Sequence, residues 1–354
     1  MALCNTPLRV GSLAASPRAV LPISPRQCPR IKGHGGPQTA AASASITLAN
    51  HSGISTTQAP QQTESFLSRY ALGAPLGQGA MGTVVSACDR VTGEEVAVKV
   101  VAKQSNAGRH QRSALHREAS LWRRACAASR QAGRFIAIEE DASNYYIIAE
   151  KCNGGSLQQM LDDRGALSEV ELSQVAWCVL TFLSDMHSQS MYYGDLKPGN
   201  VILKDVYPCS SDPGCLNVRV VDFGCSQLVT HGSPLRSLSG SPLFLAPEVI
   251  TGAYGLPADM WAFGVMLFML ICNRLPFWLE PIPYLEQLDM DSIHDAIRYN
   301  PVLFAGPKWR GVSEELKDLI CGLLEKDPAR RLTAAKAMEH PWFESTKDMC
   351  TLAL

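Results

Sequence analysis

A nine-residue stretch rich in glycine decides which fold this 354-residue chain adopts: Leu76-Gly77-Gln78-Gly79-Ala80-Met81-Gly82-Thr83-Val84. Its pattern is Gly-x-Gly-x-x-Gly-x-Val. Glycines allow the backbone to turn tightly and to bring its N–H groups close to phosphate oxygens, so the stretch predicts a nucleotide-phosphate site. A dinucleotide-binding fold has similar glycines, and the pattern alone leaves both folds open.

The residues after the glycines separate these two folds. In a dinucleotide-binding fold the loop leads from a strand into a helix, whereas here residues 83–87, Thr-Val-Val-Ser-Ala, continue as a strand. Residues 91–94, Val-Thr-Gly-Glu, form a turn, and residues 95–99, Glu-Val-Ala-Val-Lys, read as the next strand. A glycine-rich hairpin followed by Val-Ala-Val-Lys is similar to a protein kinase pattern.

Further motifs follow in order along the chain. Glu118 lies nineteen residues after Lys99, in a helical stretch with Leu115, Ala119 and Trp122 on one face. The later motifs are Tyr146-Ile147-Ile148-Ala149-Glu150-Lys151-Cys152, Gly154-Gly155-Ser156-Leu157, Tyr193-Gly194-Asp195-Leu196-Lys197-Pro198-Gly199-Asn200, Val220-Val221-Asp222-Phe223-Gly224, Gly240-Ser241-Pro242-Leu243-Phe244-Leu245-Ala246-Pro247-Glu248 and Asp259-Met260-Trp261-Ala262-Phe263-Gly264. Any one of these motifs can occur by chance in an unrelated sequence, but the complete set in this order very nearly cannot.

With these motifs the sequence resembles the eukaryotic protein kinase family, serine/threonine type, over residues 66–343. The resemblance implies an α+β, two-lobed protein kinase fold. A β-rich N-lobe would span residues 66–150 and a mainly helical C-lobe residues 151–343, with ATP in the cleft between them. Apolar spacing predicts a core helix over residues 168–187, and the apolar run 260–272 predicts the buried post of the large lobe.

The resemblance also implies catalytic and metal-binding residues. Asp195 would accept the proton of the attacking hydroxyl, Lys197 would steady the γ-phosphate, and Ser241 would keep the hydroxyl that bonds the catalytic loop. Asp222 and Asn200 would hold Mg²⁺ at the phosphates through carboxylate and amide oxygens. The lysine at position 197 resembles the serine/threonine branch, so the implied partners are protein substrates with Ser or Thr hydroxyl groups.

The implied ATP site consists of residues 76–84, Lys99, Glu118 and the linker residues Glu150 and Cys152. Glu118 would hold the Lys99 ammonium against the phosphates. Ala149 occupies the position that gates the pocket behind the adenine. Two outcomes stay open there: the small side chain admits bulky inhibitors, or neighbouring residues fill the space.

One departure from the family pattern concerns regulation. Tyr193-Gly194-Asp195 stands where the family has His-Arg-Asp. Tyr193 keeps an aromatic ring that can pack beside Phe223, but Gly194 lacks the arginine that binds a phosphate on the activation loop. Without that charge partner a loop phosphate gains little. We therefore predict that activity does not require phosphorylation of the loop, although its serines remain potential targets: Ser233, Ser237 and Ser239.

Two function classes stay open, and a third is disfavoured. An active kinase is favoured because the phosphate- and metal-handling residues form a complete set. A pseudokinase, an ATP-binding scaffold module, is the alternative, because Gly194 and Gly199 both alter the catalytic loop. A small-molecule kinase of the same fold is disfavoured by Ala246-Pro247-Glu248 and the peptide-positioning loop before it. Glu248 is expected to pair with Arg331 as a structural contact.

The branch within the family is indicated by residues 275–278, Leu-Pro-Phe-Trp, and 339–343, Glu-His-Pro-Trp-Phe. Both are similar to the calcium- and calmodulin-dependent group, especially the plant calcium-dependent kinases. No Asp-x-Asp-x-Asp-Gly loop occurs in the sequence, so no EF-hand calcium site is expected. Regulation by calcium would then have to come from another protein, and the regulator is not specified by the sequence.

Composition and charge exclude other classes. The formal net charge is −1, so a generally basic nucleic-acid binder is not expected. The longest apolar run, residues 260–272, is shorter than the roughly 20 residues that span a bilayer, so no membrane span is predicted. No Cys-x-x-Cys pair occurs among the 12 cysteines, which removes the usual zinc and thioredoxin-like interpretations. The chain is expected to be a monomer.

The N-terminal residues 1–63 differ from the rest. They contain no Asp or Glu, five Lys or Arg, and 13 Ser or Thr. Such a segment is predicted to be disordered, and its composition is typical of a transit peptide, with the chloroplast favoured over the mitochondrion or a cytoplasmic protein. Residues 344–354 form a short C-terminal tail.

Three cysteines are candidates for reactive thiols. Residues 205–216 look like an insertion between two strands and carry Cys209 and Cys215. A redox-switched disulfide between them and a pair of plain exposed thiols both stay open, with base rates favouring the thiols. Cys225, directly after Gly224, is a candidate reactive thiol near the nucleotide.

Overall fold

The structure is a computed structural model that describes residues 66–79, 82–104, 108–205, 216–285 and 287–344. Several expectations fall outside these ranges: the tail 1–63, Ala80 and Met81 of the glycine-rich loop, the insertion cysteines Cys209 and Cys215, and residues 345–354. Among the described residues, no helix combines the length and apolar character needed to cross a bilayer.

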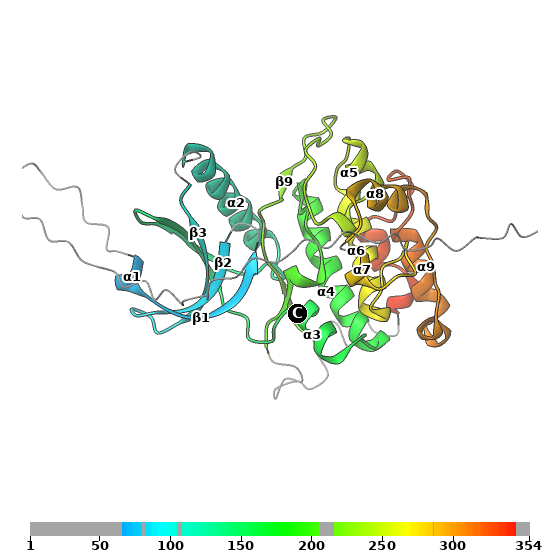
Figure 1. The fold of residues 1–354 in the computed structure, drawn as a ribbon, viewed down its shortest axis with the longest axis horizontal. Helices are drawn as coiled ribbons and strands as arrows, with labels where there is room; N and C mark the ends of the chain where they lie inside the picture. The colour runs from blue at the N-terminus through cyan, green and yellow to red at the C-terminus, as the bar shows by residue number, and fades with distance from the viewer. Residues whose placement is uncertain (1–65, 80–81, 105–107, 206–215, 286, 345–354) are drawn as a thin grey trace, which may run out of the picture. The chain divides into compact units, whose positions relative to one another are not determined.

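The first part of the domain is a five-stranded antiparallel sheet in the order β1-β2-β3-β5-β4 (Figure 1). Its strands are β1 (Tyr70–Gly79), β2 (Gly82–Asp89), β3 (Glu95–Ala102), β4 (Phe135–Glu140) and β5 (Asn144–Glu150). The glycine-rich stretch is the β1–β2 hairpin. The strand that follows it confirms the hairpin over the strand-to-helix alternative.

Successive side chains of a strand point to opposite faces of the sheet. Alternate residues of β3 and β5 therefore pack into two different hydrophobic cores. The smaller core contains Val96, Val98, Tyr146 and Ile148, with Phe66 from α1 (Phe66–Arg69) and Tyr70 from β1. The main core receives Val101, Tyr145, Ile147 and Ala149, with Leu115 and Trp122 from α2 (Gly108–Ala128). Because Lys99 is two residues before Val101, it lies on the face that α2 covers.

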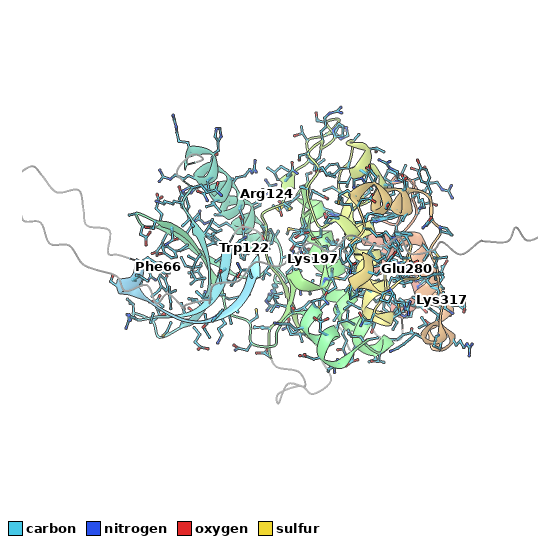
Figure 2. The ribbon with its side chains drawn as sticks, in the orientation of Figure 1. Phe66, Trp122, Arg124, Lys197, Glu280 and Lys317 are labelled. Carbon is cyan, nitrogen blue, oxygen red and sulfur yellow. The ribbon has the colours of Figure 1, made fainter. Side chains whose placement is uncertain are left out.

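The short helix α1 closes the smaller core. Phe66 is labelled in Figure 2. Its ring stacks on that of Tyr146 with centroids 3.7 Å apart and on that of Tyr70 at 4.9 Å. Only 2% of Phe66 is exposed. Phe66, the first residue that the structure describes, is therefore part of this core.

The second part of the domain is mainly helical (Figure 1). Its helices are α3 (Leu157–Arg164), α4 (Glu169–Ser188), α5 (Pro247–Thr251), α6 (Pro257–Cys272), α7 (Ile282–Leu285), α8 (Met290–Tyr299), α9 (Glu314–Leu323) and α10 (Ala334–Met338). Four short 3-10 turns are η1 (Pro198–Asn200), η2 (Pro242–Phe244), η3 (Pro307–Gly311) and η4 (Pro341–Phe343). The sheet followed by these helices confirms the α+β, two-lobed fold.

The two helices expected from apolar patterning both form. Ser168 caps α4, and its side chain and that of Glu171 make a reciprocal capping box that satisfies orphan backbone N–H groups. In α6 every residue after Pro257 is buried, including the acidic Asp259. Helix α6 is therefore the buried post of the helical lobe.

Two short strand pairs hold the loops between them. β6 (Met191–Tyr192) pairs with β9 (Gln227–Leu228), and β7 (Val201–Leu203) pairs with β8 (Val218–Val220). The loop at residues 193–200 leaves β6 and enters β7, while Asp222 lies two residues after the end of β8. This pairing is the reason that two motifs over twenty residues apart in sequence meet in space.

Candidate active site

The ammonium group of Lys99 lies between two carboxylates. Its Nζ is 3.2 Å from Oε1 of Glu118, on α2, and 3.1 Å from Oδ1 of Asp222, after β8. Burial alone would lower the pKa of Lys99, but the charges of Asp222 and Glu118 outweigh burial and raise that pKa. Lys99 is therefore a fixed cation that links the sheet to the Asp222 turn.

The glycine-rich hairpin is set by backbone packing. In the β1–β2 register Gln78 faces Thr83 and Gly77 faces Val84. A Cβ added to Gly82 would lie 2.1 Å from the carbonyl oxygen of Val100 on β3, so a side chain at Gly82 is excluded. A Cβ on Gly77 would meet nothing within 4 Å, which leaves that side of the hairpin open.

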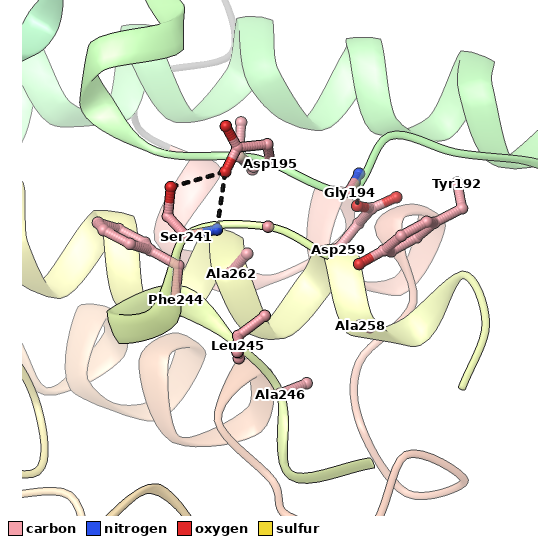
Figure 3. Close-up of a pocket in the computed structure, with 12 residues that line it drawn as sticks. Tyr192, Gly194, Asp195, Ser241, Phe244, Leu245, Ala246, Ala258, Asp259 and Ala262 are labelled. Atoms are coloured by element: carbon pink, nitrogen blue, oxygen red, sulfur yellow. Dashed lines mark hydrogen bonds between the residues drawn. The ribbon is translucent and has the colours of Figure 1, made fainter. Parts of the chain in front are cut away.

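The predicted catalytic residues converge on one carboxylate. Oδ1 of Asp195 accepts hydrogen bonds from the backbone N–H of Ser241 at 2.9 Å and from its hydroxyl at 2.7 Å (Figure 3). Oδ2 of Asp195 lies 2.9 Å from Nζ of Lys197 and accepts from Nδ2 of Asn200 at 2.9 Å. Lys197 also donates to the Ser241 hydroxyl at 2.7 Å. The structure thus brings Asp195, Lys197, Asn200 and Ser241 together.

Two oxygen donors near this carboxylate suit a hard divalent cation. The side chain of Asp222 is 39% exposed, and its backbone adopts φ +63°, a strained conformation for a residue other than glycine. The amide nitrogen of Asn200 donates to Asp195, so its amide oxygen is the atom with metal-binding chemistry. Among the described residues no group of three or more His, Cys, Asp and Glu could hold a metal. Carboxylate and amide oxygens such as these are the donors that a hard divalent cation takes together with phosphate and water oxygens.

Asp259, near the start of α6, holds the backbone of the catalytic loop through hydrogen bonds. Its carboxylate accepts hydrogen bonds from the backbone N–H groups of Tyr193 and Gly194, both at 2.9 Å, and lies 3.1 Å from Nε2 of His187. Sequence reasoning assigned Asp259 no role. The available signal was its place beside a long apolar run, because a carboxylate buried in such a helix requires hydrogen-bond partners.

The aromatic ring at position 193 packs as expected. The Tyr193 ring lies edge-on to that of Phe223, with centroids 5.5 Å apart, and its hydroxyl donates to the carbonyl oxygen of Val221. Phe223 in turn stacks on Trp122 of α2 at 5.3 Å. Burial raises the pKa of Tyr193 well above its usual value, so the hydroxyl remains a donor. The predicted contact between Tyr193 and Phe223 is confirmed.

The predicted structural ion pair is also present. A guanidinium nitrogen of Arg331 donates to Oε2 of Glu248, on α5, at 2.9 Å, and a second nitrogen bonds Oε1 of the same carboxylate. Neither side chain is more than 8% exposed. A buried two-point pair of this kind fixes α5 and hence the segment that leads from Ser241 into it.

Glu150 is the last residue of β5, and Cys152 follows it in the linker. The carboxylate of Glu150 accepts from the backbone N–H of Arg134 at 2.8 Å and lies 3.4 Å from Nε of Arg219. Its side chain is therefore committed to structural contacts. Burial raises the pKa of Cys152 to about 11, and Ala149 is only 8% exposed within the main core.

Cys225 does not have the properties of an activated thiol. It is half-buried and free, and burial together with the charges of Asp195 and Asp222 raises its pKa. Reactive cysteines have a lowered pKa because neighbouring positive charge stabilises the thiolate. The reason to single out Cys225 as a nucleophile is removed.

A small pocket lies behind Asp195, between the catalytic loop, the Ser241 segment and α6 (Figure 3). Small residues form much of its wall: Gly194, Gly240, Ala246, Ala258 and Ala262. The glycine at position 194 contributes no side chain to this space. Its backbone φ of +90° and the close carbonyl oxygen of Cys225, 2.8 Å from an added Cβ, both disfavour a larger residue.

The sheet with its single long helix, the helical lobe and the paired sites at Lys99 and Asp195 define the architecture of a protein kinase. The sequence model of the protein kinase domain family matches residues 70–343 of this chain. The chain belongs to the protein kinase family.

Its relatives include plant enzymes of the calcium-dependent group. The chain is 32% identical to calcium-dependent protein kinase 12 of Oryza sativa subsp. japonica over 280 residues, which is 79% of this chain and 50% of the relative. It is 31% identical to CDPK-related kinase 5 of Arabidopsis thaliana over 290 residues, 81% of this chain and 46% of the relative. The chain thus spans about half the length of the curated relatives it matches. The predicted similarity to this group is confirmed.

Proposed function

We propose that this protein is a serine/threonine protein kinase that transfers the γ-phosphate of ATP to protein hydroxyl groups with Mg²⁺ as cofactor. The observation that carries the proposal is the Asp195 carboxylate, whose two oxygens are oriented by Ser241, Lys197 and Asn200. The similarity to serine/threonine kinases supports it.

Each residue has a role that its contacts support. Asp195 orients the attacking hydroxyl and accepts its proton, and Lys197 supplies positive charge beside that carboxylate for the transferred phosphoryl group. Lys99, held by Glu118, binds the phosphates of the nucleotide. A Mg²⁺ ion held by Asp222 and the Asn200 amide oxygen would neutralise charge on the phosphates.

This kinase is proposed to work without phosphorylation of its activation loop. A loop phosphate needs a cationic partner to order the loop. Gly194 offers none from the catalytic loop. The alternative, an ATP-binding scaffold, rests on Gly194 and Gly199, the two positions where the catalytic loop departs from the family pattern.

The test is transfer of labelled γ-phosphate from Mg-ATP to a generic basic protein by the full chain, with calcium present and absent. Asp195→Asn is the control, because it keeps the shape of the side chain and removes the proton acceptor. Transfer that disappears in Asp195→Asn supports the kinase. Binding of ATP without transfer would support the scaffold. Equal transfer with and without calcium would show that this chain needs no calcium itself.

Independence from the loop phosphate is tested separately. Replacing Ser233 and Ser239 by alanine, singly and together, is expected to leave the rate of transfer intact. Because the Ser237 hydroxyl bonds Gln227, phosphorylation at Ser237 is tested instead by phosphatase treatment of the wild type, which is also expected to leave the rate intact. A collapse of the rate in any of these variants would contradict this part of the proposal.

Residues 1–63 are proposed to direct the protein to the chloroplast. The proposal rests on their composition, with no acidic residue among 63. Fusing these residues to a fluorescent protein in plant cells tests it. Fluorescence in chloroplasts is expected, whereas fluorescence in mitochondria or throughout the cytoplasm would overturn the assignment.

A further inference from the structure

The activation segment after Asp222 is held against the helical lobe by uncharged groups. Its first residues form β9, and the backbone N–H of Val229 donates to the carbonyl oxygen of Ser190 at 2.8 Å. Farther out, Leu235 and Tyr254 exchange two backbone hydrogen bonds of 2.8 and 3.1 Å. The segment is thereby anchored at Val229 and at Leu235, six residues apart.

Tyr254, in the connection between α5 and α6, is the centre of the outer anchor. Its hydroxyl donates to the carbonyl oxygen of Ser237 at 2.6 Å, although Tyr254 itself is only 3% exposed. Its ring lies 5.3 Å from that of Tyr192, two residues before Gly194. Tyr254 therefore joins the outer part of the segment to the beginning of the catalytic loop.

Gln227 completes the same cluster from β9. Its Nε2 lies 3.3 Å from the hydroxyl oxygen of Ser237 and 3.4 Å from that of Tyr254. The Gln227 amide thus donates to the hydroxyl groups of both Ser237, in the activation segment, and Tyr254, in the helical lobe. Together, Gln227, Ser237 and Tyr254 form a three-residue hydrogen-bonded cluster, which we call the tyrosine anchor.

Charge plays almost no part in this arrangement. Residues 225–246 contain no Asp or Glu, and Arg236 is their one Lys or Arg. Gly194 of the catalytic loop has no side chain and therefore adds no charge. Neutral hydrogen bonds in a partly buried cluster reinforce one another and need no covalent modification to form.

We propose that Tyr254 and Gln227 are positioning residues that hold the activation segment in the arrangement that presents Ser241 to Asp195. The tyrosine anchor takes the place of a phosphate paired with an arginine. The inference rests on the proposed kinase activity and explains how that activity dispenses with loop phosphorylation. Neither residue touches the reacting groups; each acts through the segment that ends at Ser241.

The test compares Tyr254→Phe, Gln227→Leu and the double variant with the full-length wild type. Phenylalanine keeps the ring beside Tyr192 and removes only the hydroxyl, and leucine keeps the approximate size of glutamine. Ser233→Ala is the matched control, because Ser233 belongs to the same segment and its hydrogen bond to the carbonyl oxygen of Thr230 is made by its backbone N–H. All proteins receive the same labelled-phosphate assay with peptide and ATP varied separately.

Loss of one such hydrogen bond is expected to lower kcat/KM for the peptide about fivefold in Tyr254→Phe. The KM for ATP and the melting temperature should stay close to the wild-type values, because Lys99 is unchanged and phenylalanine keeps the buried ring of Tyr254. The double variant should lose less than the product of the single losses, since both residues bond Ser237. Ser233→Ala should match the wild type.

A second readout does not depend on activity. Trypsin cleaves after Arg236, which is exposed within the segment, and the rate of cleavage follows the open population of that segment. Cleavage after Arg236, followed by mass spectrometry, should accelerate about fivefold in Tyr254→Phe and remain unchanged in Ser233→Ala.

The outcomes separate the two proposals. If the wild type transfers no phosphate, the kinase proposal is overturned. If trypsin then still cleaves Tyr254→Phe after Arg236 faster than it cleaves the wild type, the anchor is supported independently of activity. Wild-type transfer and cleavage in Tyr254→Phe overturn the anchor. A lowered melting temperature, with the peptide and ATP parameters changed alike, assigns Tyr254 a purely structural role and also overturns the inference.

Discussion

Asp259 and Gly194 lie 65 residues apart in the sequence, yet Oδ1 of the buried Asp259 carboxylate accepts a hydrogen bond of 2.9 Å from the backbone N–H of Gly194. The same carboxylate holds the N–H of Tyr193. The catalytic loop is therefore fixed through its backbone, from a helix that is buried along nearly its whole length. Because Tyr193 and Gly194 directly precede Asp195, the position of α6 helps to set the orientation of Asp195.

Asp259→Asn is expected to destabilise the protein by about 2–4 kcal/mol, because an amide offers one acceptor where two backbone donors need a carboxylate. The rate of phosphate transfer should fall by at least about tenfold as the loop loosens. Thermal unfolding and kcat check this, with the exposed Asp163→Asn on α3 as control. Equal melting temperatures for both variants would contradict the role of Asp259.

Gly194→Ala is expected to cost about 1–3 kcal/mol of unfolding free energy, because φ is +90° and an added Cβ lies 2.8 Å from the carbonyl oxygen of Cys225. Gly232→Ala is the matched control: its φ is +76°, but a Cβ there meets nothing within 4 Å. Denaturant unfolding of both variants isolates the contact with Cys225. Equal losses at the two positions would show that backbone strain alone matters.

Ser241→Ala should reduce kcat about 10- to 100-fold, because the hydroxyl bonds the charged groups of both Asp195 and Lys197. Ser241→Thr keeps the hydroxyl and should retain most of the rate. Steady-state kinetics with saturating ATP distinguish the two. An alanine variant as fast as the threonine variant would remove Ser241 from the site.

Alkylation of Cys152 should be slow at neutral pH and should accelerate as the pH rises. Burial raises its pKa to about 11, so at pH 8 about one thiol in a thousand is ionised. The rate at Cys152 should increase about tenfold per pH unit up to about pH 10. Mass spectrometry of iodoacetamide-treated protein measures this, with the exposed Cys88 as the site that reacts first. Rapid labelling of Cys152 at pH 7 would contradict it.

Local pattern was sufficient for the hairpin and the main helices. The glycine spacing at residues 77–82 and the strand residues after it predict β1 and β2, because both depend on neighbours in the chain. Apolar spacing predicted α4, and Ser168 marks its start. The predicted pairs Tyr193–Phe223 and Glu248–Arg331 were also confirmed, since the resemblance to known kinases supplied long-range contacts that spacing alone does not contain.

Contacts without such a pattern were not predictable. The motif at residues 259–264 included Asp259 but did not identify its hydrogen-bond partners, and no sequence pattern marked Tyr254. The partners of the Glu150 carboxylate, which bonds Arg134 and lies near Arg219, were not predicted either. In each case the partner comes from a distant segment, and its identity depends on how the lobes pack.

The sequence by itself determined the hairpin, the order of the motifs and the set of residues with phosphate and metal chemistry, because short-range periodicity and residue type carry that information. Only the tertiary structure decided which groups hold that set in place: Asp259 beneath the catalytic loop and the tyrosine anchor along the activation segment. A hydrogen bond requires two groups within about 3 Å. For residues separated by 27 or 65 positions, such as Gln227 with Tyr254 and Gly194 with Asp259, that proximity is created by chain packing.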